Sequence, residues 1–136
     1  MTSPLLKFHH LGLAVRKPEP AMAFLAAQGY RIGETLFDQE QNVNAAIGTH
    51  ETEPAVEIIW PGHTPGPIDR LVQRHAAGII YHLCYETKDL AGALAGLELA
   101  GLNVICVSPP KPAPLFGGRR VSFYNLVGIG LVEILE

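Results

Sequence analysis

The sequence predicts an α+β fold built from two β-α-β-β-β modules. The chain repeats itself with a period of about 72 residues, longer than the repeats of solenoid proteins. Each copy opens with a strand-like run whose second residue is a histidine, His10 in the first and His82 in the second. Each copy closes with a near-identical apolar strand that carries a glutamate, Glu57 in Val-Glu-Ile-Ile and Glu133 in Val-Glu-Ile-Leu.

The first copy begins with a strand over residues 9–15. A helix is predicted over residues 19–28, and Gly29 supplies the usual stop. Four apolar positions, Met22, Phe24, Leu25 and Ala26, predict that this helix is mostly buried. Strands follow over residues 30–36, 43–47 and 54–60.

The second copy repeats this order. A strand over residues 81–87 precedes a helix over residues 90–100, with Asp89 placed to cap its start and Gly101 to end it. Leucines at 90, 94, 97 and 99 approximate one apolar face of that helix. Strands are predicted over residues 103–107, 120–124 and 130–135.

A Pro/Gly connector at residues 61–66 separates the copies, and a short linker helix is predicted over about residues 66–76. The modules span about 6–61 and about 79–136. Since neither half is large enough to bury much core alone, residues 1–136 are expected to form a single domain.

The composition is that of an ordinary globular protein, with 48% hydrophobic and 17% charged residues. A net charge of −3 gives no reason to expect nucleic acid or an anionic membrane as a partner. The first residues lack the pattern of a signal peptide, so none is expected, and no apolar run approaches the roughly 20 residues of a membrane-spanning helix. The two cysteines, Cys84 and Cys106, lie in strand-like apolar segments and are expected to be buried, reduced thiols of a cytoplasmic protein.

The four repeated polar residues are the candidate site. A carboxylate in the middle of an apolar strand must be paired, protonated or bound to a metal, because burying it alone is very costly. Strand alternation puts Val56 and Ile58 on one face and Glu57 on the other, and Glu133 behaves in the same way. Two imidazoles and two carboxylates suit a divalent metal with positions left for water or substrate. The predicted ligands are His10, Glu57, His82 and Glu133.

Taken singly, each of these residues is more often an ordinary core or surface side chain than a ligand. Their matching places in both copies are hard to explain by solvation. His9 faces the other way from His10 and is left out. The remaining histidines, His50, His63 and His75, lie in loops or near helix ends and are expected to be solvent-exposed.

The run His-Leu-Gly-Leu-Ala-Val at residues 10–15 resembles the opening of methylmalonyl-CoA epimerases and glyoxalases in the vicinal-oxygen-chelate superfamily. The resemblance covers nearly the whole chain. It implies an open barrel of paired β-α-β-β-β modules around one divalent metal, either Zn, Ni, Co or Mn. The family's four ligand positions fall on the four residues named above. A homodimer is also expected.

Three segments are similar to the epimerase branch: residues 66–72 followed by 78–82, residues 115–123 and residues 128–133. The Asp-Pro-Asp-Gly turn usual in glyoxalase I is absent. One departure concerns a second glutamate that some epimerases carry as a partner base, because Ala45 occupies that position here. Gln41 and Asn42 remain as polar residues near that strand and are the predicted substrate contacts there.

The resemblance implies a metal-dependent epimerase that acts by enolate stabilisation on an acyl thioester such as methylmalonyl-CoA. With Ala45 in place of a base, Glu133 is the first candidate for proton transfer and Glu57 the second. If the substrate is a CoA or carrier-protein thioester, cations are expected to meet its phosphates. The candidates are Arg70, Arg74, Lys111, Arg119 and Arg120, of which Arg119 and Arg120 are preferred.

Three alternatives share the fold. A glyoxalase I-type lactoylglutathione lyase is compatible with the same ligands. An extradiol dioxygenase uses two histidines and one carboxylate on iron, so a fourth ligand and the short chain count against it. A non-catalytic drug-binding protein, like the bleomycin-resistance proteins, typically lacks the ligands. Fold alone does not decide among these functions.

Overall fold

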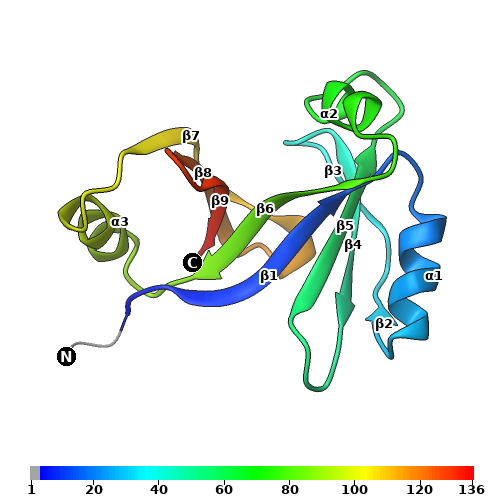
Figure 1. Cartoon of the computed structure of the whole chain (residues 1–136), viewed down its shortest axis with the longest axis horizontal. Helices are drawn as coiled ribbons and strands as arrows, with labels where there is room; N and C mark the ends of the chain where they lie inside the picture. Colours follow the sequence, from blue (N-terminus) through cyan, green and yellow to red (C-terminus); the bar gives the residue numbers. More distant parts are fainter. Residues whose placement is uncertain (1–3) are drawn as a thin grey trace. The chain divides into compact units, whose positions relative to one another are not determined.

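The predicted repeat is present in the computed structural model, which describes residues 4–136 (Figure 1). The chain forms two compact units. The first unit comprises His10–Tyr81, and the second unit comprises residues 4–9 together with His82–Glu136. Both boundaries fall within strands, after His9 and after Tyr81, and each strand is described below with the unit that holds most of it. No helix among the described residues is long and apolar enough to cross a membrane.

The first unit contains one open sheet with strand order β2-β4-β5-β1, and β3 pairs with β4. Strand β1 runs parallel to β5, and the other pairs are antiparallel. The elements are β1 (Lys7–Ala14), α1 (Glu19–Ala27), β2 (Arg31–Ile32), β3 (Leu36–Asp38), β4 (Val43–Thr49), β5 (Ala55–Pro61) and α2 (Asp69–Arg74).

The second unit repeats this plan with strand order β6-β9-β8-β7. Strand β6 is parallel to β9, as β1 is to β5, and the remaining pairs are antiparallel. The elements are β6 (Ile79–Glu86), α3 (Leu90–Leu99), β7 (Val104–Pro112), the 3₁₀ helix η1 (Pro114–Phe116), β8 (Arg120–Leu126) and β9 (Gly130–Leu135).

Both main helices end as the sequence predicts. Gly29 and Gly101 take φ values of 92° and 88°, in the left-handed region that glycine adopts at low cost. The Asp89 carboxylate accepts a hydrogen bond of 3.0 Å from the Gly92 amide, which confirms it as the cap of α3. Helix α1 has no side-chain cap and begins at its prolines.

Each unit packs its helix on one face of its own sheet. In the first unit, Val56 and Ile58 of β5 form a core with Leu25 of α1. In the second unit, Val132 and Ile134 of β9 form a core against the α3 leucines. The predicted alternation of the closing strands is therefore confirmed, and each leaves its glutamate on the face turned away from the helix.

The predicted strand over residues 30–36 is wrong in detail. Two short strands replace it, because the pairing register changes between them: Ile32 is opposite Gly48, whereas Leu36 is opposite Ala45. One extra residue on this side is a β-bulge, which interrupts the ladder. A periodicity pattern does not reveal such a shift of register.

Strand β7 runs further than the predicted 103–107, through Pro109, Pro110 and Pro112. It is at the end of its sheet and pairs only with β8, so prolines are tolerated on its open side. Two register irregularities accompany them. The edge position also explains a second correction: Cys106 is exposed, whereas Cys84 is buried as expected, and neither cysteine forms a disulfide bond.

The prediction that α1 is mostly buried is also wrong. Leu25 is its one buried residue, and Phe24 is 64% exposed. The helix is so rich in apolar residues that its sequence does not mark one face, and only contacts with the sheet select Leu25. The linker helix is shorter than predicted, with Val72 as its buried anchor.

Candidate metal centre

The first unit holds a buried histidine–glutamate pair. His10 lies on β1 and Glu57 on β5, and Glu57 is level with Gly12 in the parallel register. The His10 Nε2 atom lies 3.0 Å from the Glu57 Oε1 atom. His10 is fully buried and Glu57 is 8% exposed. The pair is therefore withdrawn from water, where a charged carboxylate needs compensation by a hydrogen bond or a cation.

The second unit holds the equivalent pair. His82 lies on β6 and Glu133 on β9, and Glu133 is level with Cys84 in the parallel register. The distance from His82 Nε2 to Glu133 Oε1 is 3.9 Å. Both residues are 2% exposed. The pair is thus buried as deeply as the first, but with a wider separation between imidazole and carboxylate.

The two pairs share one geometric rule. In each unit the glutamate is opposite the residue two positions after the histidine, Gly12 in one case and Cys84 in the other. Because residues two apart in a strand point to the same face, histidine and glutamate meet on the side of the sheet away from the helix. Imidazole and carboxylate are common ligands of divalent metal ions. Each pair is therefore chemically suited to supply two ligands of a metal site.

The neighbours of the two glutamates differ. Ile47 of β4 is opposite Glu57, whereas Phe123 of β8 is opposite Glu133. The Phe123 ring contacts the His82 ring edge-on, with centroids 5.8 Å apart. The sequence alone does not predict this aromatic contact, because only the β8–β9 register identifies Phe123 as the neighbour.

Ala45 lies on the same face of β4 as Ile47, since the two are two residues apart. It is 4% exposed and has only a methyl group there. It supplies no proton-transfer group on that face, so the carboxylate nearest in register is Glu57 itself.

Gln41 and Asn42 lie in the turn between β3 and β4, and both form hydrogen bonds with neighbouring residues. The Gln41 amide and its side-chain nitrogen donate to the Asp38 carboxylate at 3.1 and 3.0 Å. The Asn42 side-chain nitrogen donates to the loop at Thr64 and Pro65, and Asn42 has a φ of 51°. These contacts hold the turn together, and contact with substrate stays a prediction for both residues.

Arg119 and Arg120 lie on the surface of the second unit. Arg119 forms an ion pair of 3.3 Å with Glu86, and its Nε donates to the main-chain oxygen of Glu136 at 2.8 Å. Arg120 lies 3.7 Å from the Glu136 carboxylate. The other predicted cations, Arg70, Arg74 and Lys111, are exposed. Their exposure allows contact with a phosphate, which stays a prediction.

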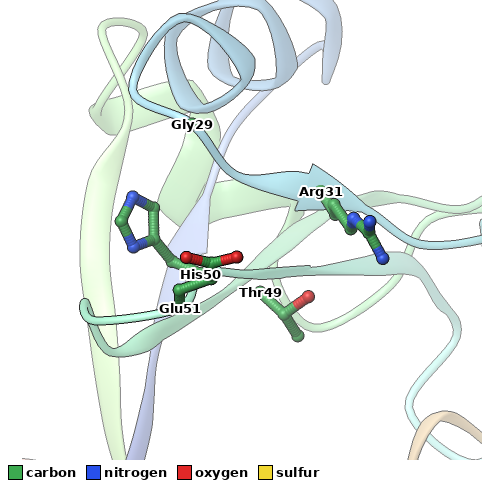
Figure 2. A pocket seen from close by; sticks show the side chains of 5 residues that line it. All are labelled: Gly29, Arg31, Thr49, His50 and Glu51. Carbon is green, nitrogen blue, oxygen red and sulfur yellow. The ribbon is translucent and has the colours of Figure 1, made fainter.

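A pocket of about 520 Å³ in the first unit is lined by Gly29, Arg31, Thr49, His50 and Glu51 (Figure 2). His50 is half-buried there rather than exposed as expected. Its Nδ1 accepts from the Thr52 and Glu53 amides, which leaves Nε2 to donate to the Gln28 carbonyl at 3.0 Å. Both nitrogens are used within the fold, so this histidine has a structural role.

A family model described as the Glyoxalase/Bleomycin resistance protein/Dioxygenase superfamily matches residues 9–123. An ethylmalonyl-CoA/methylmalonyl-CoA epimerase of Cereibacter sphaeroides is 27% identical over 106 residues, which are 77% of this chain and 78% of that protein. A mitochondrial methylmalonyl-CoA epimerase of Dictyostelium discoideum is 24% identical over 136 residues, covering 96% and 78%.

Solved structures share the fold. The methylmalonyl-CoA epimerase of Mycobacterium tuberculosis matches with a TM-score of 0.79 and 16% identity, over 100% of this chain and 91% of that one. A Streptomyces coelicolor methylmalonyl-CoA epimerase variant, in complex with 2-nitronate-propionyl-CoA, matches with a TM-score of 0.74 and 19% identity, over 96% of each chain. The predicted α+β, glyoxalase-like fold is thereby confirmed.

Proposed function

Since the chain belongs to the glyoxalase/bleomycin resistance protein/dioxygenase superfamily, we propose that it is a divalent-metal-dependent epimerase of an acyl-CoA thioester. The superfamily hosts many activities, so membership alone does not select one. The names of the relatives from Cereibacter sphaeroides and Dictyostelium discoideum support an epimerase of methylmalonyl-CoA or a similar substrate. The observation that carries the proposal is the buried histidine–glutamate pair, repeated in the same register in both units.

The proposed ligands of one metal ion are His10, Glu57, His82 and Glu133. Their donor chemistry fits, because two neutral imidazoles and two carboxylates leave a divalent ion electrically neutral and suit Zn, Ni, Co or Mn. Their burial also fits, since water-poor surroundings strengthen the attraction between carboxylate and cation. The joining of the two pairs in one centre is part of the proposal.

When bound, the divalent ion would supply Lewis-acid stabilisation of the negative charge that develops on a thioester carbonyl oxygen. Proton transfer belongs to the chain's own residues. Glu133 would take the proton from the carbon next to the carbonyl, so that the C–H bond breaks and an O–H bond forms. Glu57, the second candidate for proton transfer, would act on the opposite face of that carbon, where delivery of a proton completes the inversion. Ala45 cannot take part in proton transfer, because its side chain is a methyl group.

The experiment that tests the proposal first is the metal content of the purified, untagged protein, measured by plasma mass spectrometry. The wild type is expected to carry near-stoichiometric divalent metal, and His10→Ala and Glu133→Ala are expected to lose it. His75→Ala and Glu51→Ala are matched controls, because both residues are exposed and lie outside the two pairs. Absence of metal after reconstitution would refute the metal-dependent enzyme and favour a ligand-binding protein.

The second measurement is deuterium exchange at the carbon beside the carbonyl, screened across acyl-CoA thioesters in D₂O. Exchange with methylmalonyl-CoA or ethylmalonyl-CoA supports the epimerase. Turnover of a glutathione hemithioacetal without thioester exchange would instead support the lyase. Homodimer formation and a cytoplasmic location stay predictions, to be checked by light scattering and by cell fractionation.

A further inference from the structure

A small pocket with a basic lining lies at the end of β6 in the second unit. It has a volume of about 240 Å³, and its lining residues are Leu5, Lys7, Glu86, Thr87, Lys88 and Arg119. Three of the four charged residues are cations, although the whole chain has a net charge of −3. A local excess of positive charge in an acidic protein attracts anions to that position.

The Glu86 carboxylate balances only one of the three cations in the pocket. Glu86 pairs with Arg119, at 3.3 Å from its Nη2 atom. Among residues 4–136, the side chains of Lys7 and Lys88 form no ion pair or hydrogen bond, and both residues are exposed. Two ammonium groups therefore remain available to an anion, and a third cation would become available if the anion displaced Glu86.

The pocket lies at the end of the strand that carries His82, the histidine of the second pair. Glu86 is four residues after His82 and on the same face, because residues at even spacing along a strand point the same way. At a rise of roughly 3.3 Å per residue, the two positions are about 13 Å apart along β6. Glu86 is also level with Leu135, two residues beyond Glu133 on the adjacent strand.

We propose that this pocket binds a phosphate group of the CoA thioester, a role that rests on the proposed function. Phosphate is recognised by lysine as a point charge and by arginine through paired hydrogen bonds, and the pocket offers both. The distance from His82 suits a ligand whose reactive thioester and phosphates lie at opposite ends of a flexible arm. The phosphate would replace Glu86 as the partner of Arg119.

The test is calorimetric titration of three non-reacting ligands: CoA, 4′-phosphopantetheine and pantetheine, which lacks phosphate. The wild type is expected to bind CoA more tightly than pantetheine. The double variant Lys7→Gln/Lys88→Gln is expected to weaken CoA binding about tenfold, because it removes two charge-assisted contacts to the phosphate and their losses combine. Pantetheine binding should not change.

The variant Glu86→Gln is expected to strengthen CoA binding, in contrast to the double lysine variant. Removing this carboxylate releases Arg119 and raises the net positive charge of the pocket, so CoA should bind more tightly, by about threefold or more. A third variant, Arg119→Gln, removes the arginine of the pocket. Its matched control is Arg31→Gln, because Arg31 is an exposed arginine that lines a different pocket. Only Arg119→Gln should weaken CoA binding.

Equal affinity of the wild type for CoA and pantetheine would overturn the proposal, as would unchanged CoA affinity in the double variant. Equal affinity for CoA and 4′-phosphopantetheine would assign the site to the phosphate that CoA shares with carrier proteins, and tighter CoA binding would assign it to the nucleotide phosphates. These titrations need no turnover, so their outcome is independent of whether thioester exchange is found.

Discussion

The two histidine–glutamate pairs are alike in their backbone and different in their side-chain surroundings. Glu57 and Glu133 occupy the same register relative to their histidines. Yet His10 and Glu57 lie 3.0 Å apart, at hydrogen-bond distance, whereas His82 and Glu133 lie 3.9 Å apart. Glu57 has Gly12 and Ile47 on either side, and Glu133 has Cys84 and Phe123. The repeated backbone therefore places the same two residue types in the same register in both units. The two pairs differ in their histidine–glutamate distance and in their neighbouring residues.

This inequality bears on which carboxylate moves a proton. The Glu57 carboxylate lies at hydrogen-bond distance from His10 Nε2 and is held in place by that contact. The Glu133 Oε1 atom lies 3.9 Å from His82 Nε2 and has Phe123 opposite it on β8, so its histidine holds it less closely. The comparison thus favours Glu133 as the principal base, within the proposed function.

The largest expected effect comes from exchanging each carboxylate for its amide. Glu133→Gln keeps the size of the side chain and removes its basicity, so kcat for thioester exchange should fall about a thousandfold or more. Glu57→Gln should reduce kcat less, by about a hundredfold, if Glu57 acts mainly as a ligand and second acid. Single-turnover deuterium exchange measures both, and equal losses would remove the distinction between the pairs.

Thermal unfolding of both variants is the control for this comparison. Each amide replaces a buried carboxylate in a unit whose core is otherwise unchanged, so folding should persist. Full activity of Glu133→Gln would contradict its role as the base. The metal content of each variant separates loss of the ion from loss of the proton-transfer group.

The repeat explains why much of this site is predictable from the sequence. A single histidine or glutamate in a strand carries little information, but His10, Glu57, His82 and Glu133 recur at matching places. Strand alternation alone then predicts that Ile58 and Ile134 lie under the helices, and both do. The glycine stops at Gly29 and Gly101 follow from the same local rules.

What the sequence could not predict depends on long-range register. The bulge between β2 and β3 arises from pairing with β4, not from the residues of the strand itself. The neighbour Phe123 follows from the β8–β9 pairing, and the exposure of Cys106 follows from the edge position of β7. Local patterns carry no record of which strand pairs with which.

A second comparison concerns the cores. Ile58 and Ile134 each follow their glutamate by one residue and are 0% and 1% exposed. Truncation of either to alanine should lower the free energy of unfolding by about 2–5 kcal/mol, through lost burial and a cavity. Urea denaturation followed by circular dichroism measures this.

The same variants test the predicted single domain. If the two units unfold as one cooperative domain, each variant should shift one common transition by a similar amount. A variant that moves only one of two separate transitions would show that each unit folds by itself, contrary to the prediction. Ile80→Ala is a suitable control, because Ile80 is an exposed isoleucine.

The smallest expected effect compares the residues that follow the two helix-ending glycines. Tyr30 and Leu102 are equivalent: their amides donate to the Leu25 and Leu97 carbonyls in the same capping motif. Only Tyr30 adds a side-chain hydrogen bond, from its hydroxyl to the Pro54 carbonyl at 2.7 Å. Tyr30→Phe should therefore cost about 0.5–1 kcal/mol of unfolding free energy at neutral pH.

The pH dependence of that effect has a definite sign. Burial, and then the nearby Glu53 carboxylate, raise the pKa of Tyr30 above its usual 10.0. A phenol with a raised pKa stabilises the fold while it is protonated, so this contribution is complete below pH 10 and is lost as the pH rises through the folded-state pKa. The difference in stability between wild type and Tyr30→Phe, measured by urea denaturation, should shrink across that alkaline range. A difference in stability that does not change with pH would contradict the link between the protonation of this hydroxyl and the stability of the fold.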